Sequence, residues 1–260
     1  MKSLKIVAIS DTRFQNQDYQ RMIDKLEPNI VVLAGDCDEE FFSSSNDFYD
    51  FLHYTGKKSK VLVIKGNHDD PKWGGSKSRY SIKKINSIKG CTEISGKSVN
   101  VDGLKFLGID YESCRINANL LPLLEKHGNH VDIIISHGEI SKIRRFAKLK
   151  PLIVINGHTM GGVYSVDEVP IIMSNNIGLA LIEIKQNKVE TIEEYQIIYK
   201  LESERNGKSL RYFHVGVISD KPKANKKNYE WLNKPSYKTF KKYFKPFIFI
   251  KNQSTRENML

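Results

Sequence analysis

The chain has 260 residues, of which 40% are hydrophobic and 10% aromatic, as expected for a globular protein with one sizeable core. No apolar run approaches the ~20 residues that a membrane-spanning helix requires, so we expect no transmembrane segment. The apolar stretch at residues 4–9 is too short for a signal peptide and lacks a cleavage site. The three cysteines form no C-x-x-C pair, which argues against a disulfide framework and predicts a reducing, cytoplasmic location.

The positive charge is concentrated near the end of the chain. The formal net charge is +11, and residues 221–260 hold eleven Lys or Arg against two Glu, a net of +9. The first 220 residues therefore carry about +2, so the body is close to neutral. Any attraction to an anionic partner is expected mainly from the last 40 residues.

Apolar, β-rich runs alternate with polar segments of helical spacing from residue 4 to about residue 195. Five of the runs are near-continuous Val/Ile/Leu blocks, which is typical of strands buried on both faces. The predicted strands are 4–11, 30–37, 61–69, 104–110, 131–138, 152–158, 169–174, 180–185 and 189–195. The predicted helices are 18–26, 47–54, 80–88 and 120–127. This order predicts a layered α/β body with helices on the outer sheet faces.

Polar side chains fall where five of these strands end. Asp11 and Asp36 follow the first two runs, Asn67-His68-Asp69 follow the third, and His137 and His158 close two later ones. The carboxyl ends of strands in an α/β sheet meet at one crevice, where ligands bind. A single carboxylate after a strand is usually a helix cap, but five such ends indicate a site.

Asp, Asn and His together are a ligand set for a borderline metal such as Mn, Fe or Zn, whereas a soft metal would require thiolates. Cys37 lies beside Asp36, but a lone cysteine there is expected to be a small buried hydrophobe. Glycines precede Asp36, Asn67 and His158, which suits sharp turns where the backbone approaches an ion. The sequence therefore predicts a metal centre.

The motifs resemble those of the calcineurin-like metallophosphoesterase family: D-x-H, G-D, G-N-H-D or G-N-H-E, a lone His, and G-H-x-H, each at a strand end. Here they read Asp11-Thr12-Arg13, Gly35-Asp36, Gly66-Asn67-His68-Asp69, Ser136-His137-Gly138 and Gly157-His158-Thr159-Met160. The resemblance extends from residue 4 to about 195. It implies an αββα sandwich over residues 1–195, in which two sheets pack face to face with helices outside.

The resemblance also implies how metal would be held. One family site is complete in this chain, with Asp36, Asn67, His137 and His158 as ligands. The other keeps Asp11 and the shared Asp36, but Arg13 and Met160 occupy its two histidine positions. Because both departures fall on the same ion, we predict one strongly bound divalent transition metal ion (Mn, Fe or Zn) and a second ion that is weak or absent.

Arg13 has two interpretations. A guanidinium cannot bind a cation but can hold a phosphate, so Arg13 would clamp a phosphate oxygen where the lost ion acted. Alternatively, Arg13 pairs with Asp11 and fills space. Met160 is expected to be a neutral filler.

His68 resembles the family's general acid, which protonates or stabilises the leaving oxygen, and Asp69 would orient its ring. His68 and Asn67 would then also contact substrate. The implied function is metal-dependent hydrolysis of a phosphomonoester or phosphodiester, with a small phosphate compound, a nucleotide or a nucleic acid as substrate. The alternative, favoured by Arg13 and Met160, is a catalytically inactive protein of this fold that binds a nucleotide, a nucleic acid or a protein.

Residues 196–260 match nothing in the family pattern and are predicted to be a basic, aromatic-rich extension. The stretch 196–219 is expected to form a hairpin that turns at Asn206-Gly207. Beyond it, lysines interleave with Tyr237, Phe240, Tyr243, Phe244 and Phe247, which predicts an amphipathic helix ended at Pro246. This helix would pack on the body, bind a nucleic-acid backbone or lie on an anionic membrane surface.

Overall fold

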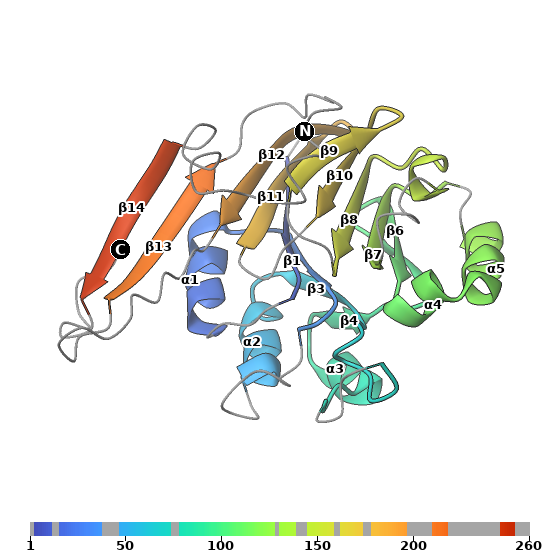
Figure 1. Ribbon diagram of the computed structural model, residues 1–260, viewed down its shortest axis with the longest axis horizontal. Coiled ribbons are helices and arrows are strands. Elements are labelled where there is room, and N and C mark those ends of the chain that lie inside the picture. Colours follow the sequence, from blue (N-terminus) through green and yellow to red (C-terminus); the bar gives the residue numbers. More distant parts are fainter. Residues whose placement is uncertain are drawn as a thin grey trace.

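The computed structural model describes residues 3–11, 16–37, 47–73, 78–127, 130–138, 145–158, 162–173, 178–196, 210–217 and 245–252. Two sheets pack face to face, with helices on their outer faces (Figure 1). Within these residues no helix is long and apolar enough to cross a membrane.

The first sheet has six strands in the order β12 (Lys188–Gln196), β11 (Gly178–Lys185), β1 (Leu4–Ile9), β2 (Ile30–Ala34), β3 (Lys60–Ile64) and β4 (Cys91–Glu93). Strands β1 to β4 are parallel neighbours, and β11 joins β1 antiparallel. The segments that follow β1, β2 and β3 therefore leave the sheet at the same edge.

The second sheet has the order β5 (Ser98–Val101), β6 (Leu104–Ile109), β7 (Ile133–His137), β8 (Ile153–Gly157), β10 (Val169–Met173) and β9 (Gly162–Val166). Strands β6, β7, β8 and β10 are parallel, whereas β5 and β9 are antiparallel to their neighbours. This arrangement again gathers the ends of three consecutive strands, β6, β7 and β8, at one edge.

Successive side chains along each strand point to opposite faces of the sheet and so enter two different cores. In β1, Ile6 and Ala8 point into the core between the sheets, whereas Val7 and Ile9 point into the outer core. Side chains of the second sheet, including Phe106 and Ile135, complete the core between the sheets. Because both faces of the central strands are covered, their sequences are almost continuously apolar, as predicted.

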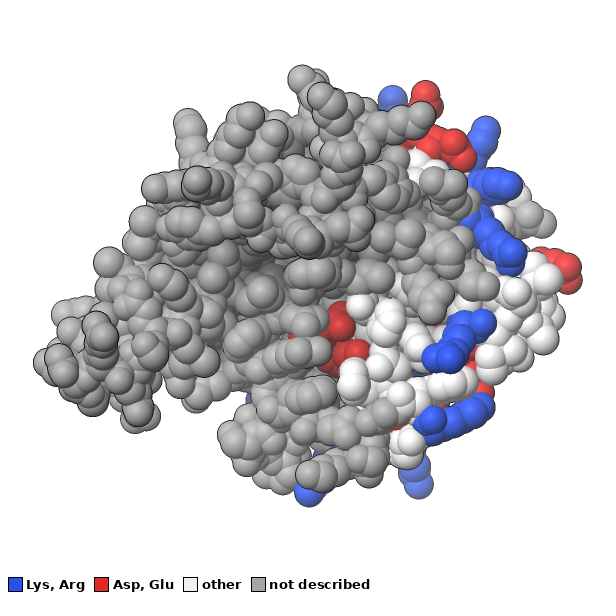
Figure 2. Space-filling model, viewed as in Figure 1, with Lys and Arg blue, Asp and Glu red and all other residues white. Residues whose placement is uncertain are grey.

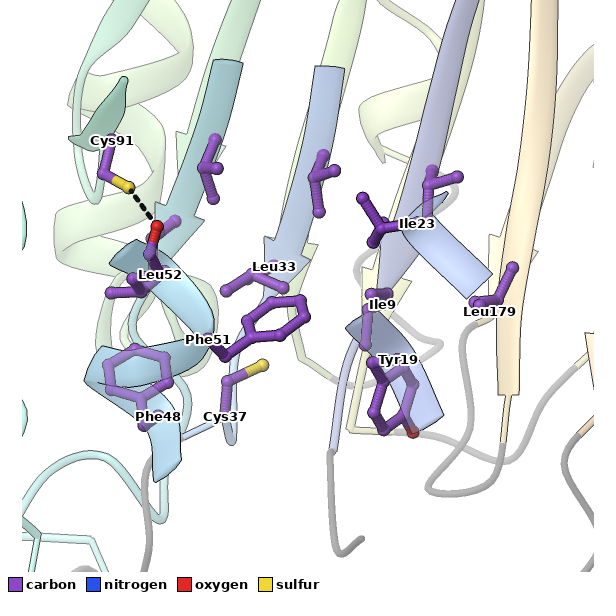
Figure 3. Packing of buried hydrophobic residues seen from close by; sticks show 14 of the residues in the cluster. Ile9, Tyr19, Ile23, Leu33, Cys37, Phe48, Phe51, Leu52, Cys91 and Leu179 are labelled. Carbon is purple, nitrogen blue, oxygen red and sulfur yellow. Dashed lines mark hydrogen bonds between the residues drawn. The ribbon is translucent and has the colours of Figure 1, made fainter. Parts of the chain in front are cut away.

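The outer core of the first sheet lies under α1 (Asn16–Leu26), α2 (Asp47–Thr55) and α3 (Ile82–Ser87). Figure 3 shows Tyr19 of α1 and Phe51 of α2 on the face of the sheet that the helices cover. Their rings pack edge to face with centroids 6.4 Å apart, a contact that contributes roughly 0.5–1.5 kcal/mol beyond area burial. Cys91 donates its thiol hydrogen to the Leu52 carbonyl and is an ordinary core residue.

The outer face of the second sheet packs against α4 (Tyr111–Arg115) and α5 (Asn117–His127). Cys114, Leu120 and Leu123 bring apolar side chains from these helices onto the sheet. The four layers are helix, sheet, sheet and helix, so the predicted αββα sandwich is confirmed.

The nine predicted strands and four predicted helices are all present, with ends shifted by up to five residues. The sequence analysis missed α4 and three strands, β4, β5 and β9. These strands are three to five residues long, and all three lie at sheet edges, where a solvated strand carries little apolar pattern.

The extension differs from its prediction where the structure describes it. Strand β13 (Leu210–Val217) pairs antiparallel with β14 (Lys245–Asn252), and residues 197–209, with the predicted hairpin turn, lie outside the described residues. The predicted helix also lies outside them up to residue 244, but continuing it to Pro246 was wrong, because Lys245 and Pro246 belong to β14. The aromatic and β-branched run 247–250 favours a strand, and a proline is tolerated near a strand's start.

All three cysteines are free and buried, in agreement with the predicted absence of a disulfide framework. Cys37 is 3% exposed, as predicted for a small buried hydrophobe, and donates its thiol hydrogen to the Gly35 carbonyl.

Candidate metal centre

The two edges at which parallel strands end face one another, and the predicted site residues gather there. Asp11, Asp36 and His158 are each the first or second residue beyond a strand and have positive φ angles of 50°, 52° and 70°. A left-handed backbone is uncommon for residues other than glycine and costs roughly 1–3 kcal/mol. The surrounding structure therefore holds these three residues in an unfavourable conformation to aim their side chains.

His137 is the centre of the cluster and is fully buried. Its Nδ1 lies 2.7 Å from the Ala34 carbonyl oxygen, to which it donates a hydrogen bond. Its Nε2 lies 3.1 Å from Oδ1 of Asn67 and 3.2 Å from Oδ2 of Asp36. Two oxygens facing one ring nitrogen fit either a proton or a cation between them.

His158 completes the cluster on the side of the second sheet. Its ring centroid lies 5.1 Å from that of His137, and ligand atoms of Asp36, His137 and His158 all lie within 4.8 Å of one another. The backbone N–H of His158 donates to Oδ2 of Asp11 at 2.9 Å. Asp11 thus supports the turn that carries His158, and it is not part of the three-residue ligand cluster.

Three glycines permit this close approach. A Cβ on Gly35, whose φ is +87°, would lie 2.6 Å from Cγ of His137, and one on Gly157 would lie 2.6 Å from its Nδ1. A Cβ on Gly66 would collide with the carboxylate and the backbone nitrogen of Asp36. The three motifs therefore require glycine at these positions, because any larger side chain would collide with His137 or Asp36.

Asp69 joins two of the loops. Its Oδ2 accepts hydrogen bonds from the backbone N–H groups of Asp36 at 2.7 Å and Gly66 at 2.8 Å. Asp36 in turn accepts the backbone N–H of His68 on Oδ1 at 2.7 Å, which leaves Oδ2 facing His137. Asp69 is 2% exposed, so these bonds are protected from water and fix the two loops to each other.

The charges of the cluster influence one another strongly. Burial by itself lowers the pKa of His137, but the facing Asp36 carboxylate outweighs it and raises the pKa to about 9. Burial also raises the pKa of Asp36, and attraction to His137 reverses that effect so that the net shift is downward. The pKa of Asp11 is raised, chiefly because its carboxylate is buried.

These residues fit a divalent transition metal ion. The donors are a carboxylate oxygen, an amide oxygen and two imidazole nitrogens, the mixed set that Mn, Fe and Zn accept. The bond from Nδ1 of His137 to the Ala34 carbonyl fixes the ring so that Nε2 faces the other ligands, the usual arrangement of a metal-binding histidine. Asp36, Asn67, His137 and His158 would hold the ion.

The structure thus brings together the four residues predicted for the complete site. Asp11 lies beside them with its Oδ2 bonded to Ser10 and to the backbone of His158. Arg13 and Met160 lie outside the described residues. His68 is partly exposed at the same edge, and the predicted role of Asp69 toward its ring stays a prediction, whereas its bonds to Asp36 and Gly66 are observed.

Sequence reasoning missed the groups that support the site. Asn156 accepts the Ser136 hydroxyl at 2.6 Å and donates to the Gly138 carbonyl at 3.1 Å, so it fixes the loop beyond His137. The ring of Tyr111 lies 5.1 Å from that of His158 and 6.2 Å from that of His137. Its position in the sequence could have revealed it, because Tyr111 directly follows the predicted strand 104–110, and the site lies where strands end.

Comparison with known proteins agrees with this geometry. The family model for calcineurin-like phosphoesterases matches residues 4–164, more than half of the chain. The chain belongs to the calcineurin-like phosphoesterase family. No curated protein sequence matches it.

Solved structures share the fold at low sequence identity. The protein TT1561 of Thermus thermophilus is 10% identical with a TM-score of 0.55, and the match covers 75% of this chain and 99% of that one. The purple acid phosphatase PPD1 from seeds of yellow lupin (Lupinus luteus) is 11% identical with a TM-score of 0.52, covering 75% of this chain and 51% of that one. At these identities the likeness concerns the fold alone. Family membership assigns the chain to the metal-dependent phosphoesterases in general, with divalent metal as cofactor.

Proposed function

We propose that the protein hydrolyses a phosphate ester with one strongly held divalent ion, bound by Asp36, Asn67, His137 and His158. The convergence of Asp36 and Asn67 oxygens on Nε2 of the fully buried His137 supports this proposal most directly. A divalent ion there would supply positive charge to a phosphate oxygen and lower the pKa of a water molecule. The ester is a phosphomonoester or a phosphodiester, and a nucleotide or a nucleic acid is included in this class.

His68 is proposed to protonate the leaving oxygen. It follows the ligand Asn67 directly, its side chain is partly exposed, and the Asp36 carboxylate holds its backbone N–H at 2.7 Å. A proton donor matters most when the leaving group is a poor one. The variant His68→Ala should therefore lose about 100-fold in kcat on an alkyl ester and much less on a nitrophenyl ester. Equal losses on both esters would refute this role.

Metal content and turnover together test the main proposal. Elemental analysis of protein reconstituted with Mn²⁺ and then dialysed should give close to one tightly bound ion per chain, and turnover of an aryl phosphodiester should need it. His137→Ala should lose both. His53→Ala is the matched control, because His53 is an exposed residue of α2, and it should lose neither. Two equally occupied sites would contradict the single strong ion.

A second candidate function is a catalytically inactive protein that binds a phosphate compound or a protein partner. It is favoured by Arg13 and Met160, which replace the two histidines of the other family site.

Under the main proposal, Arg13 anchors a phosphate oxygen. The double variant Arg13→His/Met160→His should gain a second ion and a higher turnover. If metal stoichiometry stays the same, the assignment of these positions is wrong. A metal-loaded protein that binds phosphate compounds without turnover would select the second function.

The basic extension is proposed to attract an anionic partner, with a nucleic-acid backbone as the first choice. Its net +9 over residues 221–260 supports this choice, since Lys and Arg neutralise phosphates without reading sequence. Binding should be independent of sequence and should weaken steeply with salt. Sequence-specific or salt-insensitive binding would refute it. The cytoplasm, where such partners and reduced thiols occur, remains the proposed location.

A further inference from the structure

Three side chains beside the metal ligands have no part in holding the ion. Tyr111 begins α4 directly after β6, and its backbone N–H donates to the Lys65 carbonyl just beyond β3 at 3.2 Å. Its ring lies 5.1 Å from the ring of His158. Trp73 packs edge to face on Tyr111, with centroids 5.7 Å apart. Both rings therefore line the same edge as the site.

The third side chain, Arg115, is held in place by these two rings. Its Nη1 donates to the Tyr111 hydroxyl at 2.8 Å, and its guanidinium carbon lies 4.9 Å from the centroid of Trp73 and 5.9 Å from that of Tyr111. The Tyr111 ring therefore connects Arg115 with His158, because its centroid lies 5.9 Å from the guanidinium carbon and 5.1 Å from the centroid of the His158 ring. An arginine fixed in this way loses less side-chain entropy when it binds a ligand.

Arg115 also differs from its basic neighbours in its partners. Lys65 pairs with Asp70 at 2.6 Å, and Lys72, which also lies over Trp73, pairs with Glu112 at 2.7 Å. Arg115 is exposed, and within the described part of the chain its partners are aromatic, with no carboxylate among them. Among the residues coloured in Figure 2, basic side chains lie along the side that carries α4 and α5 in Figure 1.

From this arrangement we infer that Trp73, Tyr111 and Arg115 form a second anion subsite, which binds a second phosphate group of the substrate while the first lies at the metal ligands. Arg115 supplies planar, bidentate hydrogen bonds, the geometry that suits phosphate. Tyr111 is a positioning residue, because it holds Arg115 and contacts His158. The inference rests on the proposed function and narrows its substrates to compounds with a second phosphate near the cleaved ester, either in a diphosphate or one nucleotide away.

Binding to the full-length, Mn²⁺-loaded protein tests this without depending on turnover. Calorimetry would compare thymidine 5′-monophosphate with thymidine 5′-diphosphate and thymidine 3′,5′-bisphosphate. The wild type should bind at least one two-phosphate ligand more tightly than the monophosphate. Arg115→Gln should reduce that preference by about tenfold or more, as expected for a charge-assisted hydrogen bond. Arg115→Lys should retain part of it, and Tyr111→Phe should lose a smaller part at an unchanged melting temperature.

The matched control is Lys126→Gln, which removes one positive charge at the exposed last turn of α5 and should keep the wild-type preference. If Arg115→Gln loses the preference for the diphosphate, the subsite is assigned to nucleoside diphosphates. If it loses the preference for the bisphosphate, the subsite is assigned to a nucleotide strand. The inference is overturned if Arg115→Gln loses the same affinity for all three ligands, or if its affinities stay at the wild-type values. Failure of the proposed function is distinct, since the wild type would then bind no metal or no monophosphate.

Discussion

Nε2 of His137 lies 3.2 Å from Oδ2 of Asp36, and this contact joins the two sheets of the sandwich. His137 ends β7 in the second sheet, whereas Asp36 follows β2 in the first. The bond from Nδ1 of His137 to the Ala34 carbonyl crosses the same boundary. Because its ligands come from both sheets, the site exists only when the sheets are packed together, so an ion bound there must stabilise the packed state.

We expect metal to raise the melting temperature for this reason. An ion at about 100 times its Kd stabilises the folded state by about 2.7 kcal/mol when the unfolded chain does not bind it. Scanning fluorimetry with Mn²⁺ and with a chelator should show this shift in the wild type and in the control His53→Ala. His137→Ala should show little of it, because loss of a ligand lowers affinity by about 100-fold or more. A full shift in His137→Ala would contradict the assigned ligand.

Gly66→Ala should separate damage to the site from damage to the fold. The added methyl group would collide with Asp36, so that carboxylate must turn away from His137. We expect metal affinity to fall by at least about tenfold. Gly103→Ala adds the same methyl group into open space, although its φ of +84° makes the substitution strained. It should lower stability by about 1 kcal/mol and leave metal affinity unchanged. If both variants bind metal equally well, the close approach at Gly66 does not constrain Asp36.

The resemblance to the family predicted the ligand set because each ligand follows a recognisable strand, and the ends of parallel strands must meet. The supporting groups could not be predicted in this way. Asp69 acts through the backbone N–H groups of Asp36 and Gly66, and nothing in a side-chain pattern records such bonds. Arg115 lies beside Trp73 although the two are far apart in the chain, so only the packing of one sheet's loops on the other's reveals the pair.

The extension shows a different limit of sequence analysis. Aromatics at three- and four-residue spacing predicted a helix up to Pro246, but Lys245 and Pro246 already pair with β13, as do residues 247–250. A short aromatic and β-branched run satisfies both patterns when it is read alone. Its partner, residues 210–217, lies much earlier in the chain, and pairing over that distance is not visible in local spacing.

The ion pair between Lys65 and Asp70 gives stability a pH dependence. Burial opposes the charge of Asp70, but its bond to Lys65 prevails, so the pKa of Asp70 lies below the ordinary 3.8. A carboxyl with a depressed pKa stabilises the fold above its unfolded pKa, and that contribution disappears as the pH falls through the folded pKa. Asp70→Asn should therefore lower the free energy of unfolding by about 1 kcal/mol near neutral pH.

Urea unfolding at neutral pH and at a pH below 3.8 measures this difference. The gap between wild type and Asp70→Asn should shrink as the pH falls. The control is Asp24→Asn, whose carboxylate pairs with Lys58 on the exposed surface and should change stability very little. A gap that persists at low pH would show that Asp70 acts through something other than its charge.

The last prediction concerns where the chain can be shortened. Truncation after residue 220 removes most of the extra charge, but it also removes β14, the partner with which β13 pairs along its whole length. The remaining β13, with Tyr212, Phe213, Val215 and Val217, becomes an unpaired apolar strand, and such edges aggregate. Truncation after Gln196 removes both strands and ends at β12, the edge of the first sheet. Both truncations keep all four metal ligands. We therefore expect the longer fragment to aggregate more readily by light scattering, and the shorter one to stay monodisperse and to bind about one metal ion. If the fragment ending at residue 220 is the more soluble one, pairing with β14 does not protect β13.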